Sequence, residues 1–266
     1  MSRAIGIDIS KWNISYRPDT APIKSDFVIQ RASYVGAASR SFIVDEKFYE
    51  FLPEVQKCEI RGAYHYMLNG DKLHWREQAD KFIELVQDKG FHFFVCDWET
   101  AFNTLNCTFA AEAFEWMNRV RTVLNKPVLL YTNRNGMDNY LMPCDAARIR
   151  QFPFWYASPV YNVDRVNPQT YNPPLPRRRK DFVICQYALA DYGINNQGRN
   201  YGVSSRGIDL NFYTGTVNEM RTWLGIGDNT VSPPPAPPTS ANLDVNIVIE
   251  IAGYETKTID TQLIPK

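Results

Sequence analysis

Two acidic side chains stand close together at the end of one strongly apolar run, FHFFVCDWE, residues 91–99. Side chains alternate along a strand, so Asp97 and Glu99 are expected to project to the same side. Phe93 and Val95 share that parity and would lie below them. Two carboxyl groups in one partly apolar pocket repel each other, and one pKa rises until that group keeps its proton near neutral pH. Such a pair matches the needs of glycoside hydrolysis, which uses an acid and a supporting negative charge.

Two further acids occur at the ends of other apolar runs. Asp8 lies at the end of AIGIDI, and Asp209 lies in GIDLNFY. In a barrel of parallel strands the active face is formed at the carboxyl ends of the strands. A lone Asp97–Glu99 pair could merely cap a helix or meet solvent, but four acids at strand ends favour a catalytic pocket.

Aromatic side chains are frequent at the same places. The chain contains 15 tyrosines, 15 phenylalanines and six tryptophans. One ring alone is more often a core residue, yet sugars present apolar faces that stack on aromatic rings, so coincidence with the acids favours a sugar site. The residues expected to bind the substrate are Trp12, Tyr64, Tyr66, Trp98, Tyr131, Trp155, Gln186 and Tyr187.

Metal and cofactor chemistry has little support. The three histidines lack partners at metal-ligand spacing, and no nucleotide-binding or serine-hydrolase motif occurs, so neither a metal nor a cofactor is expected. The five cysteines show no CxxC spacing, so a disulfide framework is not expected. Cys96 and Cys185 lie in apolar runs and are predicted to be buried free thiols of a chain made in a reducing compartment.

Eight apolar, strand-like runs recur at regular intervals: 4–9, 26–33, 60–67, 91–99, 127–132, 153–158, 182–188 and 207–213. Helical stripes run from Ala79 to Val86 and from Phe109 to Val120, the second after Thr108, a candidate N-cap. Strands alternating with helices predict an α/β fold with a largely parallel sheet, closed as a modified (β/α) TIM-like barrel. The intervals after residue 132 are short or proline-rich, so the last third is expected to be β-rich and helix-poor.

The composition divides the chain into three parts. Residues 1–228 are predicted to form the barrel, and residues 229–241 a proline-rich linker. Residues 242–266 are predicted to form a short β-type tail. Two short strands do not make a stable fold. The tail is therefore expected to dock, to mediate self-association or to begin a truncated module.

Charge and hydropathy exclude some classes of protein. The 29 basic residues balance the 29 acidic ones, which argues against a nucleic-acid partner. No run approaches the roughly 18 apolar residues of a membrane span, and the start MSRAIGIDIS lacks the pattern of a signal peptide. The basic run PRRRK at 176–180 is expected to be a solvated surface loop, with contact to an anionic wall polymer as the alternative.

In order and spacing, the motifs resemble those of the family-25 glycoside hydrolases, the Chalaropsis-type lysozymes. The resemblance covers about residues 4–224 and rests on IGIDISKW, GAYHYM, VCDWE, LLYT, FWYA, CQYA and GIDLNFY. It implies an N-acetylmuramidase that cleaves the β-1,4 bond between N-acetylmuramic acid and N-acetylglucosamine in bacterial peptidoglycan. The implied barrel has final strands without regular helices.

The resemblance also implies roles for the four acids. Glu99 would be the general acid, and Asp97 either the nucleophile or the group that orients the substrate's 2-acetamido group. Asp8 and Asp209 would shape the pocket and its charge. One departure is Asn13, where the family often has Gln.

Two kinds of function are compatible with these features. The favoured one is a phage lysin, made in the cytoplasm without a signal peptide, that reaches the cell wall by a holin-type or lytic route or on a virion. The rival is a non-catalytic wall-glycan-binding or virion structural component, anchored to a virion or wall partner through the tail. The presence of all four acids favours the enzyme.

Overall fold

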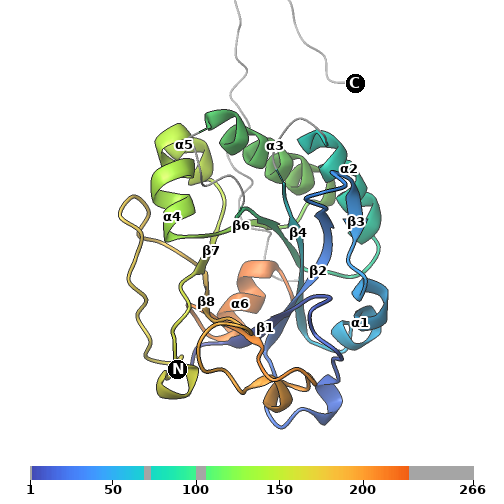
Figure 1. The fold of residues 1–266 in the computed structure, drawn as a ribbon, viewed down its shortest axis with the longest axis vertical. Coiled ribbons are helices and arrows are strands. Elements are labelled where there is room, and N and C mark those ends of the chain that lie inside the picture. The colour runs from blue at the N-terminus through green and yellow to red at the C-terminus, as the bar shows by residue number, and fades with distance from the viewer. Residues whose placement is uncertain (1, 69–72, 100–105, 228–266) are drawn as a thin grey trace, which may run out of the picture. The chain divides into compact units, whose positions relative to one another are not determined.

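The computed structural model describes residues 2–68, 73–99 and 106–227. In this part of the chain, eight strands form a closed barrel (Figure 1). They are β1 (Ile5–Ile9), β2 (Phe27–Val35), β4 (Ile60–Tyr66), β5 (Phe93–Asp97), β6 (Val128–Asn133), β7 (Phe154–Ala157), β8 (Ile184–Ala188) and β9 (Asp209–Tyr213). A short strand, β3 (Phe42–Val44), pairs with the end of β2 that extends beyond β1. The predicted TIM-like α/β barrel is confirmed.

Seven barrel strands are parallel, and β9 runs against its neighbours β8 and β1. Asp209 is the first residue of β9 and lies opposite Asp8 of β1 in the register. Because β9 is reversed, its first residue lies at the end of the barrel where the other strands finish. The expectation of a largely parallel sheet is correct, but Asp209 reaches that end from the start of a strand.

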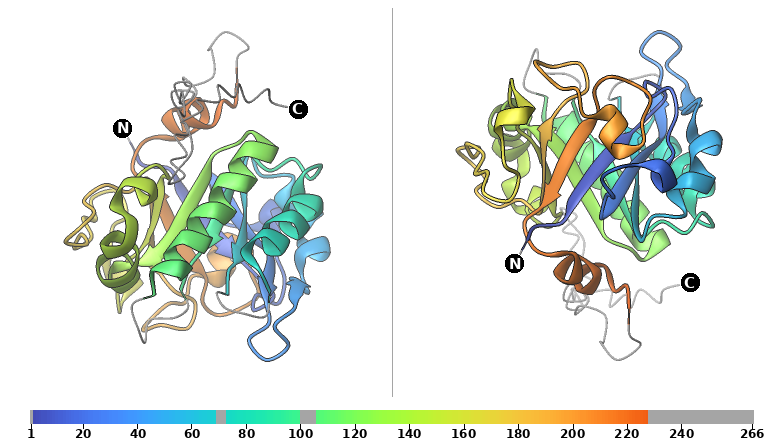
Figure 2. Two further views of the ribbon diagram at one scale, coloured as in Figure 1. Left: turned by 90° about the horizontal axis from the view of Figure 1, so that it is seen from above. Right: turned by 90° about the horizontal axis from the view of Figure 1, so that it is seen from below.

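Helices cover the outside of the barrel beside β2 to β7 (Figures 1 and 2). They are α1 (Phe48–Val55), α2 (Trp75–Val86), α3 (Cys107–Leu124), α4 (Arg134–Gly136), a π-helical turn (Met137–Leu141) and α5 (Met142–Ile149). Helix α2 buries its predicted stripe against the sheet. Helix α3 begins earlier than predicted, because the side chain of Asn106 accepts a hydrogen bond from the Thr108 backbone N–H and so provides the N-cap.

The helix-poor region begins later than the sequence suggested. Residues 134–149, between β6 and β7, are helical and pack against α3. The two later intervals, 158–183 and 189–208, contain short 3₁₀ turns, at Val163–Arg165 and Gly198–Tyr201. The β-rich character of the last third therefore applies from β7 onward.

Loop side chains, in place of a helix, cover the outside of β9. The ring centroid of Phe212 lies 6.4 Å from that of Tyr171 and 6.2 Å from that of Phe182. The guanidinium of Arg3 lies 4.6 Å from the Phe212 ring centroid and donates hydrogen bonds to the backbone oxygens of Pro168 and Tyr171. The proline-rich interval thus supplies the apolar cover that a helix supplies elsewhere.

Apolar side chains fill the barrel, and α6 (Val217–Leu224) closes one end of it. Met220 of α6 is fully buried, and the ring of Trp223 lies 5.9 Å from Tyr213 and 6.5 Å from Phe93. Helix α6 begins with a capping box formed by Thr216 and the third residue of the helix. With this end filled, the carboxyl end of the strands is the one available for a polar pocket.

The basic run at 176–180 is not simply a solvated loop. Arg179 is 1% exposed, and its guanidinium donates to the backbone oxygens of Ile149 and Phe152 and pairs with Asp181 at 3.1 Å. The prediction of a solvated loop is therefore wrong for this residue. Arg179 instead fastens the loop to the end of α5.

The compact unit ends at Gly227, and the predicted linker 229–241 and tail 242–266 lie outside the described residues. Their roles therefore stay predictions. No helix among residues 2–68, 73–99 and 106–227 has the length and apolar composition needed to cross a bilayer.

A disulfide joins Cys107, the first residue of α3, to Cys144 in α5. The bond corrects the expectation that no disulfide framework is present. Cysteine spacing does not reveal it, because the two cysteines are separated by 37 positions and meet only through helix packing. Disulfides form and persist in oxidising surroundings, which differ from the reducing compartment in which the chain is expected to be made. Cys58, Cys96 and Cys185 are free and buried, as predicted for the latter two.

Replacing Cys107 and Cys144 together by serine is expected to lower the free energy of unfolding by about 2–4 kcal/mol, because the unfolded chain loses a long closed loop. Chemical denaturation with and without dithiothreitol measures the change. Reductant should shift the unfolding midpoint of the wild type to that of the double variant and leave the double variant unchanged. Equal midpoints for the oxidised and reduced wild type would contradict the stabilising role.

Candidate active site

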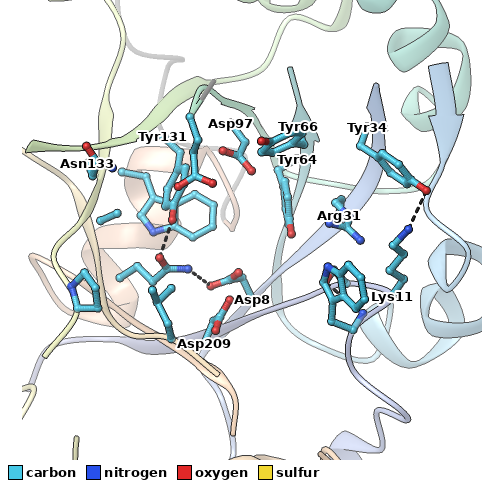
Figure 3. Close-up of a pocket in the computed structure, with 18 of the residues that line it drawn as sticks. Asp8, Lys11, Arg31, Tyr34, Tyr64, Tyr66, Asp97, Tyr131, Asn133 and Asp209 are labelled. Atoms are coloured by element: carbon cyan, nitrogen blue, oxygen red, sulfur yellow. Dashed lines mark hydrogen bonds between the residues drawn. The ribbon is translucent and has the colours of Figure 1, made fainter. Parts of the chain in front are cut away.

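A pocket of about 560 Å³ lies at the carboxyl end of the barrel strands (Figure 3). The strands present alternate side chains to it, and the apolar residues of the same parity fill the barrel below. Ten predicted site residues line this pocket: Asp8, Trp12, Tyr64, Tyr66, Asp97, Glu99, Tyr131, Trp155, Gln186 and Asp209. The structure thus brings together all four predicted acids.

Two residues predicted to bind substrate lie elsewhere. Trp98 and Tyr187 are 1% and 2% exposed and pack in the shell between the barrel and its outer cover. Each follows a pocket residue, Asp97 or Gln186, by one position, so alternation turns it outward. The geometry therefore gives no support to their predicted contacts with substrate. The alternation of side chains along the strand is the sequence signal that separates them from the pocket residues.

Asp8 is the centre of a buried hydrogen-bond network. Its Oδ2 accepts hydrogen bonds from Gln186 Nε2 at 2.9 Å and from Asn211 Nδ2 at 2.7 Å. The hydroxyl of Tyr131 donates to Gln186 Oε1 at 2.6 Å, and the indole N–H of Trp155 donates to Asn211 Oδ1 at 2.8 Å. Since each amide oxygen is already occupied, both amides must turn their N–H groups toward Asp8. Figure 3 shows the Tyr131 arm of this network.

Asp8 and Asp209 form an asymmetric pair. Burial raises the pKa of Asp8, while hydrogen bonds from Asn211, Gln186 and Asp209 oppose the rise. Burial and the neighbouring charge of Asp8 raise the pKa of Asp209 much further. The two amide N–H groups that donate to Asp8 favour its charged form, so Asp209 is the acid of the pair that protonates more readily.

Asp97 and Glu99 form the second pair of acids. Burial, followed by the charge of Glu99, raises the pKa of Asp97 well above its ordinary value, against the opposing effect of Arg31. Burial, followed by the charge of Asp8, raises the pKa of Glu99, although the Tyr131 hydroxyl hydrogen-bonds to it and opposes the rise. The pair therefore holds a proton at a pH at which exposed carboxyl groups are ionised.

Arg31 is a pocket residue that the sequence analysis did not single out. Its Nε donates to Asp45 Oδ2 at 2.5 Å, and this ion pair is largely buried. Its positive charge opposes the rise in pKa of both Asp97 and Asp8. The available signal was parity, because Arg31 follows Phe27 and Ile29 on the inner face of β2.

The rim of the pocket carries an exposed aromatic ring. Trp12 is 74% exposed, and the Nζ of Lys11 lies 5.2 Å from the centroid of its ring. Lys11 is held in turn by hydrogen bonds to the Tyr34 hydroxyl at 2.8 Å and to Glu46 at 2.9 Å. The ring of Trp12 is thus accessible to a ligand that enters the pocket across this rim.

Metal ligation has no evident place in the described part of the chain, where no group of three or more histidine, cysteine, aspartate or glutamate side chains could hold an ion. His65 belongs to β4, and its side chain lies outside the pocket on the side of α2, within hydrogen-bond distance of Ser33 Oγ and Gln78 Oε1. Burial lowers the pKa of His65 to about 4, so it is neutral. It serves packing in the outer shell.

Comparisons with known proteins agree with this geometry. The chain matches the model for glycosyl hydrolases family 25 over residues 7–192. A search of curated proteins finds no match. The match includes Asp8, Asp97 and Glu99 and ends before Asp209, which the fold itself brings to the pocket.

Solved structures share the fold. The spore cortex lytic enzyme SleM of Clostridium perfringens is 24% identical with a TM-score of 0.64, over 82% of this chain and 69% of that one. The catalytic domain of endolysin ply40, from bacteriophage P40 of Listeria monocytogenes, is 19% identical with a TM-score of 0.59, over 83% of this chain and 98% of that one.

The family match spans well over half of the chain and contains the acidic pair at the end of β5. The fold of the similar structures is the same barrel. The chain therefore belongs to family 25 of the glycosyl hydrolases.

Proposed function

We propose that this glycoside hydrolase cleaves peptidoglycan at the β-1,4 bond between N-acetylmuramic acid and N-acetylglucosamine. The observation that carries the proposal is the Asp97–Glu99 pair, whose raised pKa values keep a proton available in a pocket lined by aromatic side chains. Membership of family 25 supports the same activity.

Glu99 is proposed as the general acid. It is less buried than Asp97, lies two residues after the end of β5, and lines the pocket. A carboxyl group with a raised pKa can give its proton to the oxygen of the leaving sugar and so avoid a poor alkoxide leaving group.

Asp97 is proposed as the partner of Glu99 in the same reaction. Among the described residues, its buried Oδ1 has no hydrogen-bond partner. A buried acceptor without a partner is costly, and a substrate N–H would satisfy it. The 2-acetamido group of the sugar offers such an N–H, which favours the role of orienting that group for attack on the anomeric carbon over the role of nucleophile.

Asp8 is proposed to stabilise the transition state electrostatically. Glycosidic cleavage develops positive charge on the sugar ring, and a preorganised negative charge lowers the energy of that state. The amides of Gln186 and Asn211 already hold the Asp8 carboxylate in place. Asp209, the acid of its pair that protonates more readily, shapes the pocket and, when protonated, adds no second negative charge.

We further propose that the enzyme works as a phage lysin on the bacterial cell wall. The similar fold of an endolysin catalytic domain from a bacteriophage supports this biological role. The exposed ring of Trp12 and the tyrosines of the pocket, Tyr64 and Tyr66, would stack on or position the glycan.

Glu99→Gln is expected to lower the rate of cell-wall clearing by about 10²–10⁴-fold, because the amide cannot donate a proton to the leaving oxygen. Turbidity loss of purified walls measures the rate, and mass spectrometry of new reducing ends should find muramic acid in the wild-type digest. Glu84→Gln, an exposed site on α2, is the matched control and should clear walls at the wild-type rate. Clearing by Glu99→Gln as fast as wild type would overturn the assignment.

Asp97→Asn is expected to lose activity and gain stability. A folded-state pKa above the unfolded value means that the contribution of Asp97 to stability is complete at low pH and lost as pH rises through the folded pKa. The neutral amide avoids that loss, so the melting temperature at pH 7 should rise by about 2–4 °C.

The gain from Asp97→Asn should shrink toward zero near pH 4, where the wild-type carboxyl group is protonated. Thermal unfolding followed by circular dichroism at both pH values checks this, with Asp88→Asn, an exposed site after α2, as the control. A lower melting temperature at pH 7, or a gain that is equal at both pH values, would show that the buried charge is not costly.

A further inference from the structure

A second hollow of about 470 Å³ adjoins the catalytic pocket at the ends of β6 and β7. The two hollows share Asn133, Ala157 and Pro159 in their linings. We call it the side groove; the polar groups in its lining that could meet a ligand are Asn133, Arg134, Asn135, Asn139, Ser158 and Arg177. A ligand in the catalytic pocket can therefore extend into the side groove.

The side groove is rich in hydrogen-bond donors. Its lining contains one acid, Asp138, whose two oxygens accept the backbone N–H groups of Arg177 and Arg178 at 2.8 Å each. Although burial acts to raise the pKa of Asp138, these two N–H donors and the charges of Arg177 and Arg134 hold it below the ordinary value. Asp138 is thus ionised but already occupied, and two guanidinium groups face the groove.

Arg134 and Arg177 differ in how many guanidinium donors remain free to bind a ligand. Arg134 Nη2 donates to the backbone oxygens of Pro174 at 2.6 Å and Leu175 at 3.0 Å, which makes it part of the wall. The side chain of Arg177 is 76% exposed, and its polar contacts are long, 3.4 Å to Asn139 Oδ1 and 3.7 Å to Asp138. Since Asp138 anchors its backbone, Arg177 presents a guanidinium group with spare donors from a fixed position.

The side groove is unlike the other rim of the catalytic pocket. That rim carries the exposed ring of Trp12, which suits the apolar face of a sugar. The aromatic residue in the lining of the side groove is Tyr156, which is 1% exposed and donates its hydroxyl hydrogen to Pro174 O at 2.7 Å. The groove thus offers guanidinium and amide donors instead of a stacking platform, and this chemistry fits a carboxylate on an extended peptide.

We propose that the side groove binds a carboxylate of the stem peptide carried by the glycan in the catalytic pocket, with Arg177 as the residue that determines this preference. The inference rests on the proposed function, since the peptide is attached to the muramic acid of the same chain that is cut. Covalent attachment brings the peptide to a groove that adjoins the pocket, so even a modest contact raises the affinity for peptide-bearing glycan.

The test compares Arg177→Gln with Arg178→Gln. Both arginines are exposed and adjacent in sequence, but Arg178 lies outside the lining of the groove. The substrates are soluble glycan chains with uncrosslinked stem peptides, and the same chains after an amidase has removed the peptides. For Arg177→Gln, the ratio of kcat/KM on peptide-bearing to stripped glycan should fall about tenfold, mainly through KM, as expected for one lost charge-assisted contact.

Arg178→Gln should keep the wild-type ratio. An unchanged ratio in Arg177→Gln, or an equal fall in Arg178→Gln, would overturn the inference while leaving the proposed function intact. A wild-type enzyme that cuts neither substrate would instead refute the proposed function. Equal melting temperatures of the three proteins show that the comparison reports binding and not folding.

Discussion

The pairing of β1 with the reversed strand β9 is the contact on which the pocket depends. It closes the barrel, because β1 otherwise pairs only with β2 on its other side. The same register places Asp8 opposite Asp209. If β9 ran parallel to its neighbours, its first residue would lie at the opposite end of the barrel. Closure and the assembly of one acidic pair are therefore consequences of one set of backbone hydrogen bonds.

The closed barrel also sets the electrostatics of the site. With apolar side chains below and α6 across the far end, the acids stand in a poorly solvated pocket, and burial is the largest cause of each raised pKa. Such burial costs stability unless partners compensate. Asp8 receives these partners from Gln186 and Asn211, whereas Asp97 keeps an oxygen without one. The hydrogen-bonding groups of Asp8 are thus satisfied. The energetic cost of an unsatisfied buried oxygen falls on Asp97, the acid proposed to contact substrate.

Features that depend on neighbouring residues could be predicted from the sequence. Recurring apolar runs indicate the strands, and Asp97 shares a face of β5 with Phe93 and Val95 because side chains alternate along any strand. The same alternation places Trp98 outside the pocket. The sequence therefore already contained the signal against its predicted contact with substrate. The family resemblance followed from the order of these short motifs, which the family match supports.

Features that depend on distant segments required the tertiary structure. The amino-acid sequence by itself determined the strand runs, the parity of their side chains and the set of acids available for catalysis. Only the folded barrel decided that Asp209 enters from a reversed strand, that Arg31 meets Asp45, and that Cys107 bonds to Cys144. These contacts join segments whose separation along the chain carries no periodic signal, so they follow from packing of the whole barrel and not from local preference.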